Sequence, residues 1–288
     1  MVKRDLYMKK ISPFIDTPVV KVITGIRRCG KSVFMEQIRL ELIKRGVPEK
    51  QILFLNLESQ TDTRVRDLDS VLQAVKSMAP SKRKRVYLFL DEVQELLGWE
   101  TMINSFLVDF NIDIYITGSN AYMLSGELST YLAGRYVEIK MYPFSFAEVT
   151  RLYKQQKSPL SESKIFQVFL IKGGFPFLYQ YQFSQSDTNQ YIADIFDSII
   201  LKDIAQRNKV RDIAQLRQLV LFFLANAGNT FSASSLVKYM KNEKRNVATE
   251  TIYNYIEYCR SACFPGQILP HGKIWPGKLF FPLSRKYI

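Results

Sequence analysis

The sequence predicts an α/β fold, in which helices cover both faces of a parallel sheet, followed by a smaller helical part. Two observations predict this. In the first half, short apolar runs rich in β-branched residues alternate with longer segments whose apolar residues recur every three or four positions. The short runs are almost continuously apolar, which is typical of strands buried on both faces of a sheet. After about Arg151 the strand-like runs stop and helical patterns follow.

Each predicted element has its own boundary signals. The first strand is opened by Pro18 and closed by Gly25. The helix after it covers about Lys31–Arg45 and stops at Gly46, a usual residue at a helix C-terminus. The expected strands are Val19–Thr24, Ile52–Leu57, Val86–Leu90, Ile112–Thr117 and Tyr136–Ile139. The other expected helices are Asp69–Met78, Glu100–Phe110, Ser161–Ile171, Thr188–Gln206, Asp212–Asn226, Ala233–Lys241 and Thr249–Ala262.

Length and charge bound the organisation of the chain. It has 288 residues, which at about 150 residues per domain predicts two domains. The net charge of +13 is unevenly spread, because residues 1–150 hold 21 basic and 18 acidic side chains, whereas residues 151–288 hold 19 and 9. An anionic partner of the surface is therefore expected on the second half.

Residue counts exclude several chemistries. A single histidine, His271, leaves no material for histidine-based zinc sites or Ser-His-Asp triads. The cysteines, Cys29, Cys259 and Cys263, are too few for a disulfide framework. The longest apolar run, Leu219–Ala225, is far shorter than a bilayer span. We therefore expect a soluble, cytoplasmic protein without membrane contact.

The segment Gly25-Ile26-Arg27-Arg28-Cys29-Gly30-Lys31-Ser32 matches the phosphate-binding pattern G-x-x-x-x-G-K-[ST]. A loop closing at two glycines turns successive backbone N–H groups around a phosphate, and the helix that follows points its positive end at the same anion. Lys31 then reaches the β- and γ-phosphates of ATP and Ser32 binds Mg²⁺. The expected nucleotide contacts comprise this whole segment and Val33. Arg27 and Arg28 have two open roles, added charge near the nucleotide or a structural or solvent-facing position, and Cys29 is expected to be only a small loop residue.

Three further segments supply candidate catalytic groups. The strand Val86–Leu90 delivers Asp91, which would hold Mg²⁺ through water, and Glu92, which suits polarisation of an attacking water; the alternative is a strand ending in solvated acids. After another apolar strand, Ser119 or Asn120 would sense the γ-phosphate, unless this segment is an ordinary turn. Arg135 would either complete a neighbouring subunit's site as an arginine finger or form a structural ion pair.

Together these segments resemble a known family over about residues 1–262. The segments that carry the resemblance are Gly25–Ser32, Leu90–Gln94 with Trp99, Thr117–Asn120, Ala133–Arg135, Tyr142–Val149 and Gly173–Pro176. They are similar to prokaryotic ATPases of the AAA superfamily that carry a C-terminal domain of unknown function. The resemblance implies a P-loop sheet in the order 5-1-4-3-2, a helical lid, a winged-helix domain, and ATP binding and hydrolysis.

The resemblance also implies domain boundaries. We expect an ATPase core at 1–151, a lid at 152–210, a winged helix-turn-helix at 211–264 and a Pro/Gly-rich tail at 265–288. Members of the family usually continue with a further domain, so this chain is expected to be C-terminally truncated. Many relatives place a nucleotide-sensing arginine in the lid where this chain has Gly173–Pro176, which leaves backbone contact with the nucleotide or an ordinary helix start.

The last two predicted helices have the spacing of a helix-turn-helix. The residues near the exposed start of its second helix are Thr249, Glu250, Tyr253 and Asn254. Those placed to touch DNA phosphates are Lys238, Lys241, Lys244 and Arg245. The alternative is a protein-protein or intersubunit module, since Glu243, Glu250 and Glu257 oppose DNA. The basic run 82–85 is either a solvated loop or a nucleic-acid contact.

The sequence thus predicts an ATP-binding, ATP-hydrolysing protein of the AAA type whose nucleotide state moves a lid and a winged-helix module. Its expected partners are ATP and ADP, DNA through the winged helix, and a further copy of the chain or another protein. The rival functions are a nucleotide-regulated DNA-binding switch with negligible turnover and a P-loop kinase of a small acceptor. A GTPase is disfavoured, because Asn208-Lys209-Val210-Arg211 lacks the aspartate of the guanine-selecting pattern.

Overall fold

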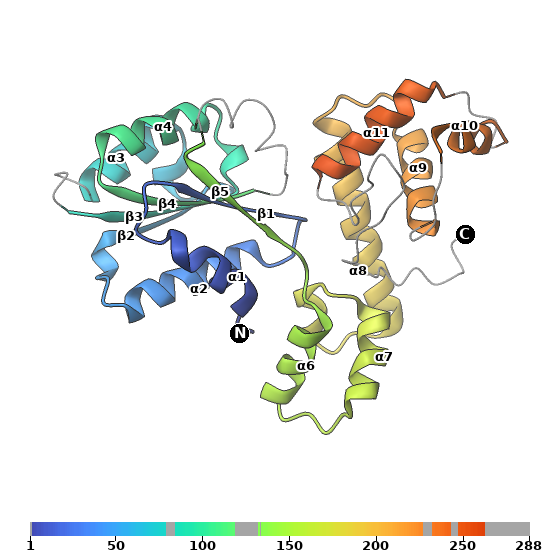
Figure 1. Cartoon of the computed structure of the whole chain (residues 1–288), viewed down its shortest axis with the longest axis horizontal. Coiled ribbons are helices and arrows are strands. Elements are labelled where there is room, and N and C mark those ends of the chain that lie inside the picture. The colour runs from blue at the N-terminus through green and yellow to red at the C-terminus, as the bar shows by residue number, and fades with distance from the viewer. Residues whose placement is uncertain are drawn as a thin grey trace. The chain divides into compact units, whose positions relative to one another are not determined.

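The computed structural model describes residues 2–78, 84–118, 132, 134–226, 232–242 and 247–262. The chain divides into two compact units (Figure 1). The first comprises Met1–Gly25 and Cys29–Tyr142, and the second comprises Ile26–Arg28 and Pro143–Ile288. Three residues of the predicted phosphate-binding loop are therefore grouped with the second unit.

The first unit is built on a five-stranded sheet in the order β2-β3-β4-β1-β5, with every neighbouring pair parallel. Its strands are β1 (Val20–Gly25), β2 (Ile52–Asn56), β3 (Val86–Asp91), β4 (Ile112–Gly118) and β5 (Tyr136–Met141). Read from β5 to β2, this is the predicted order 5-1-4-3-2, and it confirms the predicted fold class. Parallel strands place all their carboxyl ends at one edge, so the ends of β1, β3 and β4 lie close together.

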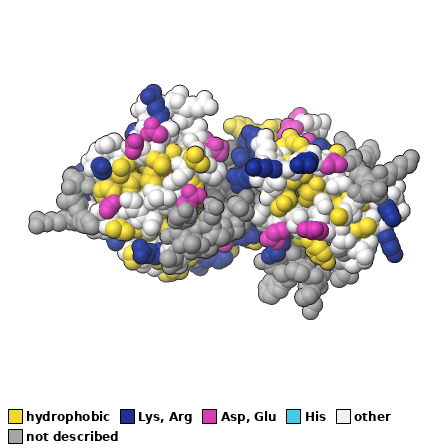
Figure 2. Space-filling model, turned by 90° about the horizontal axis from the view of Figure 1, so that it is seen from above, with side chains coloured by type: hydrophobic (Ala, Val, Ile, Leu, Met, Phe, Trp, Pro, Cys, Tyr) yellow, Lys and Arg dark blue, Asp and Glu magenta, His cyan; other side chains and the backbone are white. Residues whose placement is uncertain are grey.

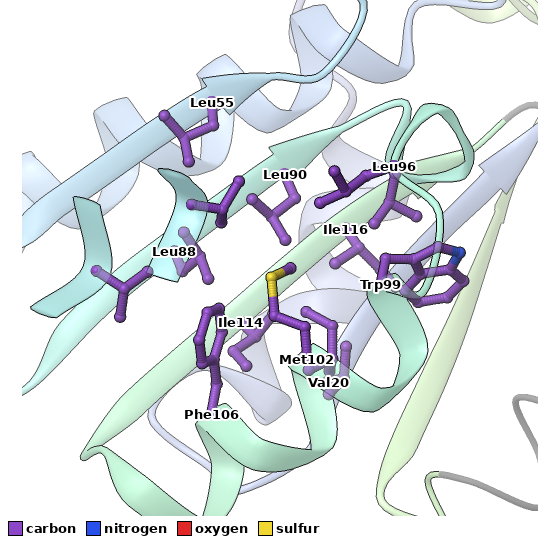
Figure 3. Close-up of a cluster of buried hydrophobic side chains, with 14 of the residues drawn as sticks. Val20, Leu55, Leu88, Leu90, Leu96, Trp99, Met102, Phe106, Ile114 and Ile116 are labelled. Carbon is purple, nitrogen blue, oxygen red and sulfur yellow. The ribbon is translucent and has the colours of Figure 1, made fainter. Parts of the chain in front are cut away.

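Helices cover both faces of this sheet (Figure 1). One face carries α3 (Leu68–Met78) and α4 (Trp99–Asp109), and the other carries α1 (Asp5–Ile11) and α2 (Lys31–Lys44). The first face is sealed by an apolar cluster in which Trp99, Met102 and Phe106 pack against residues of β1, β3 and β4 (Figure 3). Strands buried on both faces explain why the sequence shows continuous rather than alternating apolar runs. Short 3₁₀ segments connect these elements: Ser12–Phe14, Glu49–Gln51, Thr63–Val65 and Val93–Glu95.

In the second unit, every regular element of the described residues is a helix. They are α6 (Phe146–Gln155), α7 (Glu162–Lys172), the 3₁₀ helix η6 (Pro176–Tyr179), α8 (Gln185–Ser198), the π-helix η7 (Ile199–Gln206), α9 (Ile213–Ala225), α10 (Ala233–Asn242) and α11 (Thr249–Ser261). The sequence predicts all but α6 and η6, and it does not predict that the helix ending at Gln206 changes from α to π winding. The lid and winged-helix assignments stay predictions.

Helix α6 shows why its segment escapes prediction from apolar spacing. It begins at a capping box, in which the Ser145 side chain accepts from the backbone N–H of Glu148 and the Glu148 carboxylate accepts from that of Ser145. Only Val149 and Thr150 of this helix are buried, so its apolar stripe is short. The helix runs across position 151, the predicted end of the core, whereas the first compact unit ends at Tyr142.

Gly173 and Gly174 have structural explanations within the second unit. Gly173 ends α7 with a φ of +67°, a conformation that glycine adopts more readily than other residues. A Cβ at Gly174 would lie 2.3 Å from the carbonyl oxygen of Phe144, and the backbone N–H of Phe144 donates to the Gly174 carbonyl at 2.6 Å. Both glycines are therefore required by the backbone geometry that joins α6 and α7. None of the helices within the described ranges combines the length and apolar content needed to cross a membrane.

Candidate functional site

The candidate site lies where β1 ends and α2 begins. Gly25, the last residue of β1, has a φ of +154°, and a Cβ there would come within 2.4 Å of the Met141 carbonyl oxygen. Gly30, just before α2, has a φ of +99°. Both motif glycines are therefore required by backbone geometry, because other residues would meet strain or collision there. The predicted strand-loop-helix arrangement is thus present in the described residues.

The first turn of α2 offers its backbone N–H groups to an anion. Gly30 occupies the N-cap position and has no side chain with which to cap them. Ser32 and Val33 follow in this turn, and both are exposed, so the Ser32 hydroxyl is accessible to a ligand. Uncapped N–H groups and the positive end of the helix dipole together favour a phosphate at this position.

Lys31 is buried in the first turn of α2, with 4% of its surface exposed. Its Nζ donates to the carbonyl oxygen of Gly25 at 3.2 Å and lies 3.5 Å from Oε1 of Glu92. Burial by itself lowers the pKa of this ammonium, but the Cys29 side chain and the carboxylates of Glu92 and Asp91 together outweigh burial and the pKa is raised. Lys31 therefore carries a positive charge at physiological pH while holding only long contacts.

Asp91 is the last residue of β3 and Glu92 follows it, and a residue of β4 binds both. The Thr117 hydroxyl donates to Oδ1 of Asp91 and accepts from the backbone N–H of Glu92 at 2.9 Å. Thr117 and Asp91 are both buried. The sequence pattern predicts Ser119 or Asn120, two and three residues later, and does not identify Thr117; the signal that could identify it is a polar residue next to the last position of a buried strand.

Glu92 is held in a specific and strained conformation. Its φ of +53° is uncommon for a residue with a side chain. Nε2 of Gln94 donates to Oε2 of Glu92 at 2.6 Å, while Oε1 faces Lys31. Three groups therefore fix this residue: Thr117 at its backbone, Gln94 at one carboxylate oxygen and Lys31 at the other. Strained backbone that neighbouring contacts maintain is common at functional sites.

The donor atoms suit magnesium bound together with phosphates. A serine hydroxyl at Ser32 and a carboxylate at Asp91 are both oxygen ligands, which Mg²⁺ prefers. Among the described residues, no group of three or more His, Cys, Asp or Glu side chains could hold a metal ion alone. Mg²⁺ is usually bound through one or two protein ligands plus substrate phosphates and water, so this donor set fits it.

The loop arginines have partners within the second unit. Nε of Arg27 donates to both carboxylate oxygens of Asp203, at 3.0 and 2.9 Å. The Arg28 guanidinium lies 5.9 Å from the ring centre of Tyr191. Of the two roles left open by the sequence, these contacts favour a structural one for Arg27. The carbonyl of Cys29 accepts from Nη1 of Arg4 at 3.3 Å, and burial raises the pKa of the Cys29 thiol.

Of the remaining predicted catalytic residues, Arg135 is described by the structure, and it lies away from this site. Arg135 is exposed and its carbonyl accepts from the backbone N–H of Val20 at 2.8 Å, at the amino end of β1. The phosphate-binding loop follows the carboxyl end of the same strand, so Arg135 lies at the opposite edge of the sheet. Only a role in another copy's site remains for it as a catalytic residue. Ser119 and Asn120 lie outside the described residues.

The predicted helix-turn-helix residues are exposed where the structure describes them. Lys238 and Lys241 lie on α10. The exposed residues of the first two turns of α11 include Thr249, Glu250, Tyr253 and Asn254. Both basic and acidic side chains lie on the surface of this unit (Figure 2). Lys244 and Arg245 fall outside the described ranges.

Comparisons with known proteins find matches to both the sheet-containing part and the helical part of the chain. Residues 17–150 match a family model described as an AAA domain, and residues 163–262 match that of a domain of unknown function, DUF8612. An uncharacterized protein of Haemophilus influenzae is 37% identical over 262 residues, which cover 91% of this chain and 65% of the relative. An uncharacterized protein of Methanocaldococcus jannaschii is 26% identical over 271 residues, covering 91% and 58%. The chain thus spans about three fifths of the length of these relatives.

The fold has a counterpart among solved structures. A Walker-type ATPase of Pyrococcus abyssi superimposes with a TM-score of 0.57 at 14% sequence identity, covering 90% of this chain and 89% of that one. At this identity the similarity shows a shared fold.

Proposed function

Since this chain is a P-loop protein of the AAA type with a domain of unknown function after its sheet, we propose that it binds ATP with Mg²⁺ and hydrolyses it. The observation that carries the proposal is the contact between Lys31 and Glu92. A buried ammonium follows the glycine loop and lies 3.5 Å from a carboxylate whose backbone is fixed by Thr117. A cation for the phosphates and a base for water are thereby held next to each other.

Each residue has a stated role in this proposal. Backbone N–H groups of Gly25–Ser32 surround the β-phosphate, and Lys31 binds the β- and γ-phosphates. Ser32 and Asp91 would hold Mg²⁺, which neutralises charge on the phosphate oxygens when bound. Glu92 orients a water and accepts its proton as the water oxygen bonds to the γ-phosphorus and the bond to the ADP oxygen breaks. Lys31 must leave Glu92 to reach the phosphates, which frees Oε1 for this water.

The proposed output of this cycle is movement of the second unit, with a lid at 152–210 and a winged helix at 211–264. ATP and ADP are the proposed ligands. Arg135 would serve a neighbouring copy in an assembly of this chain, since its edge of the sheet is far from its own loop.

Replacing Glu92 with Gln tests hydrolysis directly. The amide keeps the shape of the side chain but cannot take a proton, so phosphate release should fall about 10²–10⁴-fold while ATP binding is retained. Glu95→Gln is the matched control, because Glu95 is an exposed acid three residues away. Phosphate release without any added acceptor would exclude the kinase alternative. Unchanged turnover in the Glu92 variant would contradict the proposed role.

A second candidate function is nucleotide-regulated DNA binding by α10 and α11. It is favoured by two exposed lysines of α10, Lys238 and Lys241, and by the exposed Tyr253 and Asn254 of α11, a helix that packs against α10. Each lysine that contacts a phosphate contributes about 0.9 to the slope of log affinity against log salt. The double variant Lys238→Gln, Lys241→Gln should therefore flatten that slope by about 2. Absence of binding to duplex DNA even at low salt would favour a protein partner for this face.

A further inference from the structure

The phosphate-binding loop is held through Arg27, a position at which the loop motif accepts any residue. Arg27, the third residue of the loop, binds Asp203, which lies 176 positions later. Its Nε is nearly equidistant from both carboxylate oxygens, at 3.0 and 2.9 Å. The Asp203 side chain is 1% exposed and that of Arg27 is 22% exposed. Charge-assisted hydrogen bonds of this kind are among the strongest that a protein makes.

Asp203 belongs to the π-helix η7, which continues α8. Ile199, Ile200 and Ile204 of the same segment are also buried, so Asp203 belongs to the buried part of η7. A buried carboxylate is costly unless it is paired, and Arg27 supplies that pairing. π-helical segments are rare and occur often at functional sites, where they change which side chains share a face.

Arg28 provides a second, independent attachment to the same helical segment. Its φ of +61° is strained for a residue with a side chain. Its guanidinium lies 5.9 Å from the ring centre of Tyr191, in α8. Strained backbone persists when surrounding contacts determine it. Two consecutive loop residues are thus held by α8 and η7.

We infer that Asp203 is a positioning residue of the phosphate-binding loop. Acting through Arg27, it fixes the backbone of Ile26–Arg28 in the conformation that receives a nucleotide phosphate, an inference that rests on the proposed function. Pre-ordered backbone N–H groups bind an anion more tightly than groups that must first be ordered. By thermodynamic linkage, a bound nucleotide in turn stabilises the Arg27–Asp203 pair and the π-helix.

The test compares Asp203→Asn with a matched ion-pair variant in the full chain. Asp197→Asn is the control, because Asp197 lies in α8 and pairs at 2.8 Å with Arg217, a residue of α9 and not of the loop. The dissociation constant for Mg-ATP, measured by calorimetry, should rise about tenfold in Asp203→Asn and stay unchanged in Asp197→Asn. Asp203→Glu keeps the charge and should recover most of the affinity. The double variant Arg27→Met, Asp203→Asn should bind no more weakly than Arg27→Met alone.

A nucleotide-free measurement separates this inference from the proposed function. Cys29 is fully buried in the loop, and Cys259 is buried in α11. Alkylation of Cys29, followed by mass spectrometry, should quicken in Asp203→Asn while alkylation of Cys259 does not. If wild type binds no nucleotide but this pattern holds, the proposed function fails and the anchoring of the loop stands. Unchanged alkylation of Cys29, or equal losses of affinity in both aspartate variants, would overturn the inference.

Discussion

Two buried lysines lie ten positions apart in the first unit, and their surroundings differ. Lys21 is inside β1 and Lys31 is in the first turn of α2; neither is more than 4% exposed, and each has a carboxylate beside it. Nζ of Lys21 donates to Oδ1 of Asp113 and to the Thr17 carbonyl at 3.1 Å. Oδ2 of Asp113 accepts from the Tyr115 hydroxyl at 3.0 Å. This pair is therefore enclosed in a hydrogen-bond network.

Lys31, by contrast, has long contacts and a partner that solvent can reach. Its Nζ is 3.2 Å from one acceptor and 3.5 Å from Glu92, whose side chain is 13% exposed. Burial lowers the pKa of Lys21 even though Asp113 opposes this, whereas the pKa of Lys31 is raised. Burial of a lysine side chain therefore does not by itself identify it as a functional group. Loose contacts at a helix start, with an accessible partner, distinguish the lysine that can accept a ligand.

The largest expected effect follows from replacing Lys21 with Met. This leaves the Asp113 carboxylate buried without its cation, which should lower the free energy of unfolding by about 3–5 kcal/mol. Urea denaturation of the variant and wild type measures this difference. The double variant Lys21→Met, Asp113→Asn should recover a large part of the loss, because it removes the buried charge. A loss below about 1 kcal/mol would mean that the enclosed pair resembles a surface pair.

Lys31→Met should show the reverse pattern. Its pair is longer than that of Lys21 and its carboxylate is partly exposed, so the free energy of unfolding should fall by less than in Lys21→Met. Loss of a cation aimed at the phosphates should reduce ATP turnover by about 10²–10³-fold. Steady-state phosphate release and urea denaturation of the same preparation separate the two effects. Normal turnover in a folded variant would remove Lys31 from the site.

The contrast also shows what the sequence could predict. Local patterns determine the strand ending at Gly25, the helix starting at Lys31 and the delivery of Asp91 and Glu92, because each depends on neighbours along the chain. The Lys21 network is not predictable in this way, since a lysine within an apolar run gives no sign of a partner on β4. The same holds for Asp203, whose partner is 176 positions away.

Thr117 is a residue of the candidate site that the sequence pattern at a strand end does not predict. The sequence identifies this strand end as a candidate site, but its pattern favours Ser119 and Asn120 over a residue inside the strand. Which residue touches Asp91 depends on register, and β4 pairs with β3 so that Leu90 is opposite Ile116. The next residues along these two strands are Asp91 and Thr117, so Thr117 can bridge Asp91 and the N–H of Glu92. Only the three-dimensional structure shows this register.

Thr117→Val should have a smaller effect than either lysine variant. Valine keeps the shape and burial of threonine but cannot donate to Asp91 or accept from the N–H of Glu92. Turnover should fall about tenfold, the equivalent of one hydrogen bond to a charged group, with little change in ATP affinity. Thr117→Ser keeps the hydroxyl and should restore most of the turnover. Equal losses in both variants would indicate a packing role for Thr117 instead.

The smallest expected effect is a difference in alkaline stability between the two lysines. The folded-state pKa of Lys21 lies below 10.5, in a setting where burial and Arg85 oppose its charge and Asp113 and Asp16 favour it. Between that pKa and 10.5 the unfolded state binds more protons, so the stability of wild type relative to Lys21→Met should rise with pH. The slope cannot exceed about 1.4 kcal/mol per pH unit.

Lys31 has the opposite sign, because its folded-state pKa lies above 10.5. Its contribution is fully present well below 10.5 and is lost as the pH rises from about 10.5 through the folded value. As the pH rises toward and past 10.5, the difference in unfolding free energy between wild type and Lys31→Met should therefore first stay constant and then fall, while the difference between wild type and Lys21→Met rises. Urea denaturation across this range measures both differences. Parallel curves for the two variants would mean that the enclosed and the loosely held lysine experience equivalent surroundings, and the distinction between them would fail.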